Sequence, residues 1–272
     1  MPIIGADDMH SLYQPVLDIV REAAETQILP FFRTLEDKDI QEKSPGDLVT
    51  VADRGSEIFL SEKLATLLPE ASVIGEEAVA ANASLMDNIG ADAAWIIDPI
   101  DGTGNFAAGR APFGILIALA EAGETVAGWL YDPLTQRICH AHFGHGAYID
   151  GEKIVARESG EDMPIAALST LFLEEEGRKK VIRKAEGHFR LVDIPRCAAE
   201  QYPRLVLGTN DVSIFERTLP WDHAAGILFL NEAGGKAARA DDSPYKVADQ
   251  RTGLIGAASP RLWDKAARIL SN

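Results

Sequence analysis

The most informative stretch of the sequence is Trp95-Ile96-Ile97-Asp98-Pro99-Ile100-Asp101-Gly102-Thr103-Gly104-Asn105-Phe106. It begins as an apolar run short enough to be a buried strand. A break is expected at Asp98-Pro99, because proline has no N–H for a strand ladder and disfavours helical backbone in the preceding residue. Asp98 is therefore predicted at the end of a strand, and Asp101 on the turn that follows it.

The residue types on this turn favour phosphate chemistry. Mg²⁺ takes oxygen ligands and usually keeps water and substrate phosphate in its remaining positions. Backbone N–H groups of a glycine-rich turn suit a phosphate. The stretch thus offers both halves of a metal-assisted phosphoryl site. An Asp-Pro turn that merely closes a buried strand remains an alternative, because both residues are common turn formers.

Three further segments place acidic residues at the ends of predicted elements. They are Lys43–Asp53, the short apolar run with acids Ser72–Glu77, and Trp221–Gly226, which opens an apolar helix. Thr50-x-x-Asp53 also fits a helix-capping box, so Asp53 has a structural explanation beside a catalytic one.

In this order and spacing, the four segments resemble the inositol monophosphatase family of Mg²⁺-dependent, lithium-sensitive phosphatases. The marks of that family are Gly-Glu-Glu (75–77 here), Asp-Pro-Ile-Asp-Gly-Thr-x-Asn-Phe (98–106) and Trp-Asp before a helix (221–222). The resemblance covers most of the chain. It implies hydrolysis of a small polyol or sugar phosphate, of the inositol-1-phosphate type in the first place, by metal-activated water without a phosphoenzyme.

The resemblance also assigns roles around two or three Mg²⁺ ions. Glu76, Asp98 and the Ile100 carbonyl would hold one ion, and Asp98, Asp101 and Asp222 a second. Glu76 and the Thr103 hydroxyl would orient and deprotonate water, with Asp53 close by, and the Gly102 and Thr103 N–H groups would hold phosphate oxygens. Without cations, so many carboxylates in one place would repel one another.

Substrate contacts are implied for Asp101, Asp222, Ala199 and Glu216, and for Lys43 on a loop beside the metals. A solvated lysine on a polar loop is equally compatible with Lys43. The spacing from Glu216 to Asp222 is one residue shorter than is typical of inositol phosphatases. Histidinol phosphate, fructose 1,6-bisphosphate and phosphoadenosine phosphates therefore stay open as substrates.

Other classes of protein explain less of the sequence. A glycosidase could use two carboxylates, but it would not need the Gly-Thr-Gly turn. A non-catalytic metal-binding or regulatory protein on the same fold would be expected to lose Glu76 or Thr103, and both are present. A dinucleotide fingerprint starting at Gly102 lacks its third glycine and its downstream acid.

The amino-acid composition limits which binding partners and which cellular compartment are expected. The net charge of −16 argues against a nucleic-acid partner, and two cysteines provide no disulfide framework and favour a reducing compartment. Asp7 and Asp8 stand where a signal peptide would carry positive charge, and the apolar runs are too short to span a bilayer. We expect a soluble cytoplasmic protein that contacts no membrane, and the resemblance implies a homodimer.

The element pattern predicts an α+β protein in two parts. Residues 1–155 carry helices and then an antiparallel meander of strands, and residues 156–272 alternate strands and helices as a smaller α/β half. With the resemblance, this implies the layered α-β-α-β-α sugar-phosphatase fold, with most metal ligands in the first half. Residues 36–47 are predicted to be a loop. His140, His142 and His145 are interpreted as a solvated strand face rather than a zinc site.

Overall fold

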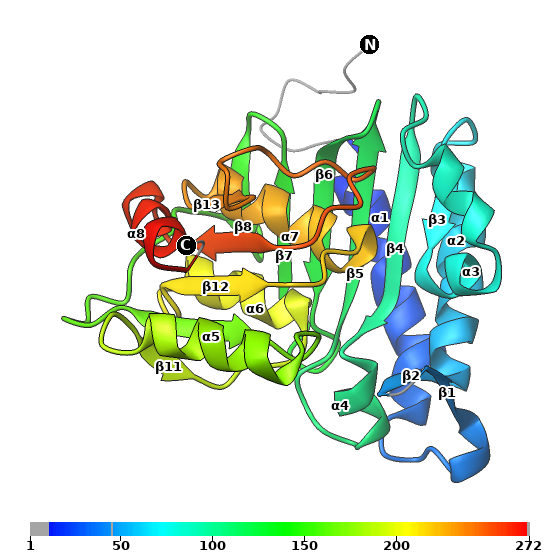
Figure 1. Ribbon diagram of the computed structural model, residues 1–272. Coiled ribbons are helices and arrows are strands. Elements are labelled where there is room, and N and C mark those ends of the chain that lie inside the picture. The colour runs from blue at the N-terminus through cyan, green and yellow to red at the C-terminus, as the bar shows by residue number, and fades with distance from the viewer. Residues whose placement is uncertain (1–10, 45, 271–272) are drawn as a thin grey trace.

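The computed structural model describes residues 11–44 and 46–270 (Figure 1). Asp7, Asp8 and Pro45 lie outside the described residues. No helix within these two ranges is both long and apolar enough to cross a bilayer.

A seven-stranded sheet forms the first half of the fold. Its strands, in order across the sheet, are β3 (Ser72–Gly75), β4 (Ala94–Asp101), β5 (Gly114–Glu121), β6 (Glu124–Tyr131), β7 (Ile138–His142), β8 (Gly146–Ile149) and β9 (Glu152–Ile154). β3 runs parallel to β4, and every later neighbour is antiparallel. Every residue of β4 is buried, because helices cover both faces of the sheet at this point.

Two long helices cover one face of this sheet. α1 (Tyr13–Ala23) continues through a π-helical turn, η1 (Ala24–Ile28), into the 3₁₀ turn η2 (Leu29–Phe31), which contains Pro30. α2 (Val51–Leu67) starts at Thr50, whose side chain accepts hydrogen bonds from two N–H groups of the first turn. The apolar sides of both helices pack on Trp95, Ile97 and their neighbours to form one of the main cores.

The second half contains a five-stranded mixed sheet. Its order is β11 (Arg190–Val192), β10 (Ile165–Ser169), β12 (Val212–Phe215), β14 (Leu254–Ala257) and β13 (Lys236–Ala238). β10 is parallel to both of its neighbours, and β14 is antiparallel to both of its own. α5 (Glu175–Ala185) and α8 (Pro260–Leu270) cover its outer face in a separate small core.

The helices α6 (Ala198–Val206) and α7 (Pro220–Glu232) lie between the two sheets (Figure 1). α7 packs on β4 to β8 of the first sheet and on α6, while α6 also contacts β12. One core joins side chains of both sheets with those of α6 and α7. The resulting order of layers is α-β-α-β-α, which confirms the predicted fold class. The predicted boundary between the two halves, at residue 155, falls between β9 and β10. The division into two halves stays a prediction, because α6 and α7 pack on both sheets and join them.

The predicted loop at residues 36–47 is wrong in part. After the 3₁₀ turn η3 (Asp37–Asp39), the chain forms a hairpin of β1 (Ile40–Ser44) and β2 (Asp47–Thr50), which lies against the short helix α4 (Thr103–Ala107). β1 is mostly polar and exposed and β2 has only four residues, so neither shows the alternation that signals a strand. The connection after β3 holds α3 (Glu76–Ala81) and the 3₁₀ helix η4 (Ala83–Asn88).

The prediction of a solvated histidine face is also wrong. His140 and His142 are each only 2% exposed. The His140 ring lies between those of Tyr13 and Tyr148, at centroid distances of 4.0 and 4.9 Å. These rings form part of the packing between α1 and the first sheet. Their burial depends on this tertiary contact, so no local sequence pattern predicts it.

Candidate active site

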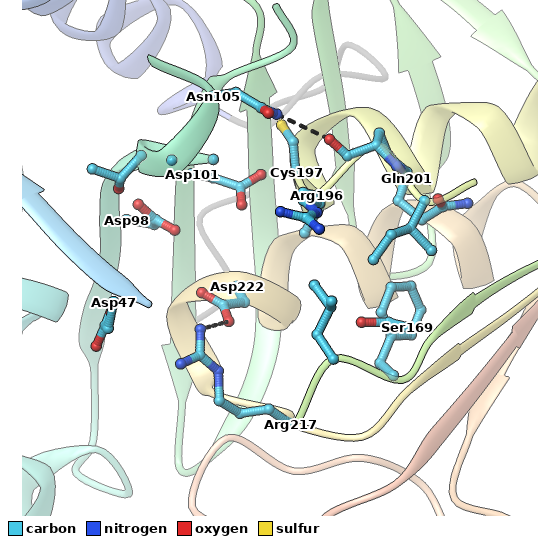
Figure 2. Close-up of a pocket in the computed structure, with 18 of the residues that line it drawn as sticks. Asp47, Asp98, Asp101, Asn105, Ser169, Arg196, Cys197, Gln201, Arg217 and Asp222 are labelled. Atoms are coloured by element: carbon cyan, nitrogen blue, oxygen red, sulfur yellow. Dashed lines mark hydrogen bonds and ion pairs between the residues drawn. The ribbon is translucent and has the colours of Figure 1, made fainter. Parts of the chain in front are cut away.

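A cavity of about 460 Å³ opens where the end of β4, the start of α7 and the second sheet meet. Figure 2 shows its polar side chains, which come from both halves of the chain. Among the predicted site residues, those lining it are Glu76, Asp98, Ile100, Asp101, Gly102, Thr103 and Asp222. The fold thus gathers residues that are up to 146 positions apart in the sequence, since Glu76 and Asp222 are both members.

The end of β4 shapes the floor of the cavity. The pairing of β4 with β5 shifts register between Asp98 and Asp101, so the chain bulges where the sequence predicted a break. The Ile100 N–H donates to Asp98 Oδ1 at 3.1 Å and fixes that carboxylate. Gly102 has φ of +85°, a conformation that costs a residue with a side chain about 1 kcal/mol or more. It turns the chain into α4 and leaves Thr103 facing the cavity.

Three carboxylates form a cluster. Glu76, Asp98 and Asp222 each place an oxygen so that all three lie within 4.8 Å of one another. Burial raises the pKa of Asp98 and of Asp222 well above the usual range, and the Glu76 charge raises both further. The cluster is therefore unfavourable without a counter-charge. A hard divalent cation such as Mg²⁺ fits the donor set, which consists only of oxygen atoms.

Asp101 lies beside this cluster and is turned toward the start of α6. Its Oδ2 accepts a hydrogen bond from the Ala199 N–H at 2.6 Å, and Figure 2 shows it near Cys197. Burial raises the pKa of Asp101 to about 6, although the Ala199 N–H acts in the opposite direction. Ala199 itself is 5% exposed and is not among the lining residues, so its contact with the site is through its backbone.

Asp53 both caps a helix and reaches the site. Its Oδ2 accepts from the Thr50 N–H at 2.7 Å, which completes the predicted capping box at the start of α2. Its Oδ1 lies 3.0 Å from the Thr103 hydroxyl, which is also 2.9 Å from the Ile100 carbonyl. Burial raises the pKa of Asp53 to about 7. One carboxylate therefore links the cap of α2 to the side chain that faces the cavity.

Glu57 is a site residue that the sequence reasoning missed. Its carboxylate accepts the N–H groups of Glu77 and Ala78, at 2.8 and 2.7 Å, and so holds the first turn of α3, which carries Glu76. A Cβ on Gly75 would lie 2.3 Å from the Glu57 Cδ, so only glycine permits this approach. Burial raises the pKa of Glu57 to about 7. The available signal was an acid one turn after Asp53 on a face that should be apolar.

Lys43 reaches the site from the β1–β2 hairpin. Its Nζ lies 2.8 Å from both Glu76 Oε1 and Glu77 Oε1. Burial lowers the pKa of Lys43, but the Glu76 and Glu77 carboxylates outweigh it, and the net shift is upward. Glu76 and Glu77 both lie in the first turn of α3, so both acids can face the same lysine. Lys43 contacts a carboxylate of the cluster, but it is not among the lining residues of the cavity.

Glu216 lies outside the cavity. Its Oε1 accepts from the Thr252 hydroxyl at 3.2 Å, whereas its neighbours Phe215 and Arg217 line the cavity. β12 ends at Phe215 and the chain bends at Glu216, and of these three consecutive residues only Phe215 and Arg217 line the cavity. Arg217 and Arg196 were not singled out from the sequence, because nothing local distinguishes them from surface arginines.

The protein is therefore a layered α+β protein. At the edge of its first sheet, it carries a carboxylate cluster of the kind that binds a divalent cation. The sequence model of the inositol monophosphatase family matches residues 8–272, and the chain belongs to this family of phosphatases.

Curated relatives agree with this assignment. The chain is 31% identical to an inositol-1-monophosphatase of Bacillus subtilis, over 87% of this chain and 88% of the relative. It is also 31% identical to a fructose-1,6-bisphosphatase/inositol-1-monophosphatase of Thermotoga maritima, over 72% and 74%, and to the Nus factor SuhB of Vibrio cholerae, over 91% and 92%. The names of these relatives differ, so they do not identify one substrate.

Solved structures share the fold. The extragenic suppressor protein suhB of Bartonella henselae superposes with a TM-score of 0.81 at 23% identity, covering 96% of this chain and 99% of that one. An inositol monophosphatase of Zymomonas mobilis gives a TM-score of 0.76 at 26% identity and covers 96% of both chains.

Proposed function

We propose that this chain is a Mg²⁺-dependent phosphomonoester hydrolase that acts on a small polyol or sugar phosphate, with inositol-1-phosphate-type compounds as the first candidates. The observation that carries the proposal is the cluster of Glu76, Asp98 and Asp222 oxygens, within 4.8 Å of one another at the wall of a cavity. Membership of a phosphatase family supports the same reaction class.

Glu76, Asp98 and Asp222 would hold the cations, with the Ile100 carbonyl and Asp101 as further ligands. When bound, the cations would neutralise the phosphate, lower the pKa of water and stabilise the leaving oxygen. The turn residues Gly102 and Thr103 line the cavity beside these ligands, and their N–H groups would hold phosphate oxygens.

Thr103 is the group best placed to orient the attacking water. Its hydroxyl hydrogen is shared between the Asp53 carboxylate and the Ile100 carbonyl, at 3.0 and 2.9 Å. Donation in that direction leaves the lone pairs of Thr103 Oγ1 free to accept a hydrogen from water in the cavity. Asp53 thereby fixes the direction in which the water presents its nucleophilic oxygen, and Glu76 can accept the proton that the water loses.

A non-catalytic regulatory role is the second candidate, because one relative of 31% identity is named as a Nus factor. The presence of Glu76 and Thr103 favours catalysis over this candidate. The deciding experiment measures phosphate release from inositol 1-phosphate, fructose 1,6-bisphosphate, histidinol phosphate and 3′-phosphoadenosine 5′-phosphate. Each is tested with Mg²⁺, with a chelator and with added Li⁺.

We expect phosphate release that requires Mg²⁺ and stops in the chelator. Inhibition by Li⁺ would show that the chain shares the lithium sensitivity of the family. The Thr103→Val variant is the matched control, since it keeps the shape of the side chain and removes the hydroxyl. Release that persists in the chelator, or equal release by Thr103→Val, would contradict the proposed mechanism. Binding without release would favour the regulatory role.

A further inference from the structure

The cavity also has cationic lining residues. Ser169, Phe172, Gln201, Arg196 and Arg217 line it from the second half of the chain and are called the arginine side here. An alcohol whose phosphate sits on the carboxylate side would extend its remaining part toward these residues. The chemistry of this arginine side therefore bears on which alcohol the site accepts.

Arg217 retains hydrogen-bond donors for a ligand. Its guanidinium lies over the Phe172 ring at 4.2 Å and is turned toward Asp222 (Figure 2). The distance from Arg217 Nη2 to Asp222 Oδ2 is 3.6 Å, which is longer than a hydrogen bond. Its Nε is buried and has no hydrogen-bond partner among the described residues. A buried N–H without an acceptor costs about 1–3 kcal/mol, so a ligand that supplies an acceptor is favoured.

The backbone of Arg217 is held in place by two buried rings. The Arg217 carbonyl can only accept, so the 3.0 Å contact with His223 Nε2 is a donation from the imidazole. His223 Nδ1 then accepts from the Tyr202 hydroxyl at 2.8 Å. Because the backbone of Arg217 is already held, the side chain loses less conformational entropy when it binds an anion than it would on a mobile segment.

Arg196 is held at the cavity in a strained conformation. Its φ of +54° lies in the left-handed region, where a residue with a side chain costs about 1 kcal/mol or more relative to glycine. The Asn105 side-chain amide fixes the turn by donating to the Pro195 and Pro112 carbonyls, at 3.0 and 2.8 Å. An arginine at a position better suited to glycine points to a function for its side chain.

We propose that the arginine side of the cavity binds a second anionic group of the substrate, so that the preferred substrate is an alcohol phosphate that also carries a carboxylate or another phosphate. Arg217 and Arg196 are the residues that set this preference. The inference rests on the proposed hydrolase function and revises its order of candidates, because it places neutral polyol phosphates such as inositol 1-phosphate after substrates with a second anionic group. A neutral polyol would offer these two guanidinium groups no charge-assisted hydrogen bond.

The test compares substrates that differ by one anionic group. 3-Phosphoglycerate is paired with glycerol 3-phosphate, and fructose 1,6-bisphosphate with fructose 1-phosphate. We expect kcat/KM to be about tenfold or more higher for the member with the second anion, as one charge-assisted hydrogen bond implies. The first pair reports on a carboxylate and the second on a phosphate, so the two pairs distinguish the two anions.

The Arg217→Gln and Arg196→Gly variants should each lower this preference about tenfold. The ratio within a pair is the readout, because Arg217 also lies near Asp222 and its loss can lower turnover on every substrate. Arg196→Gly relieves the left-handed strain and should fold at least as well as the parent. Arg183→Gln removes an exposed arginine of α5 and is the control that should keep the parent ratio.

Phosphate release with equal kcat/KM within both pairs would overturn this inference and leave the hydrolase function standing. An unchanged ratio in both arginine variants would do the same. If no compound releases phosphate, the hydrolase function fails, and calorimetric Kd values for the same pairs decide the inference separately. Tighter binding of the doubly anionic members, lost in Arg217→Gln, would support it, and equal binding would overturn it.

Discussion

The carboxylate side and the arginine side of the cavity are built in different ways. Asp98, Asp53 and Glu57 are at most 5% exposed, lie on β4 or α2, and accept hydrogen bonds from backbone N–H groups. Arg217 is held through its carbonyl, and its side chain is 37% exposed. The groups assigned to chemistry therefore sit on rigid elements, and those assigned to substrate choice sit on connecting segments, as loop placement generally allows.

The two sides also differ in the charge of the group that would stabilise them. The carboxylate cluster has an excess of negative charge, which a cation would offset. The arginine side has donors without acceptors, which an anion would offset. The three predictions below follow from this contrast, and each would sharpen or break it.

The largest effect is expected for Asp98→Asn. Loss of the central carboxylate should lower kcat/KM by about 10³ or more on every phosphomonoester, whereas Arg217→Gln should change mainly the ratio within a substrate pair. Because Asn removes a charge from a crowded cluster at constant size, thermal stability in chelator should not fall. Phosphate release and thermal unfolding provide the two measurements. Substrate-selective loss in Asp98→Asn would remove the distinction between the two sides.

An intermediate effect is expected from pH in the absence of metal. Burial raises the pKa values of both Asp53 and Glu57 to about 7, so the folded state binds protons that the unfolded chain releases above about pH 4.5. The stability that these protons contribute is complete below the unfolded pKa values and is lost as the pH rises through 7. These two groups alone should make the free energy of unfolding in chelator about 4 kcal/mol lower at pH 8 than at pH 5.5, and the raised pKa values of Asp98, Asp101 and Asp222 act in the same direction.

Urea denaturation at several pH values measures this free energy. Glu57→Gln should make the profile less steep near pH 7, because it removes one of the buried carboxyl groups whose pKa is raised. A metal-free protein that is more stable at pH 8 than at pH 5.5 would show that the carboxylate side is not under the electrostatic stress described here.

The smallest effect is expected for Tyr202→Phe on the arginine side. Loss of the hydroxyl leaves His223 Nδ1 buried without a donor, which should lower stability by about 1–2 kcal/mol. The preference for a second anion should fall by less than in Arg217→Gln, since the contact of His223 with the Arg217 carbonyl remains. Tyr245→Phe is the matched control, because that hydroxyl makes only a 3.4 Å contact with the Thr218 carbonyl. Equal behaviour of both tyrosine variants would remove the positioning role of Tyr202.

Local sequence signals located the carboxylate side well. Thr50-x-x-Asp53 is a capping pattern, and the structure confirms it. The apolar run before Asp98 predicts the strand correctly, but β4 continues through a bulge to Asp101 instead of ending at Asp98. The fold class could also be predicted, from the order of strand and helix patterns and from the family resemblance. Signals of this kind exist wherever a site residue also starts or ends an element.

The arginine side and several elements could not be predicted, because tertiary contacts decide them. Glu57 faces the site only because α3 begins above it, and of the neighbours Glu216 and Arg217 only Arg217 lines the cavity. The β1–β2 hairpin carries polar residues on both faces, and β13 is a three-residue strand defined by its pairing with β14. No pattern within either segment distinguishes it from a loop.

The location of the arginine side on the second half of the chain has an evolutionary consequence. Arg196 lies just before α6 and Arg217 just before α7, whereas Glu76, Asp98 and Thr103 lie at the edge of the first sheet. Substitutions in the segments before these two helices can exchange one leaving group for another while Glu76, Asp98 and Thr103 stay in place at the first sheet. After gene duplication, a chain of this architecture can acquire a new substrate through a few changes in connecting segments while its inherited reaction is preserved.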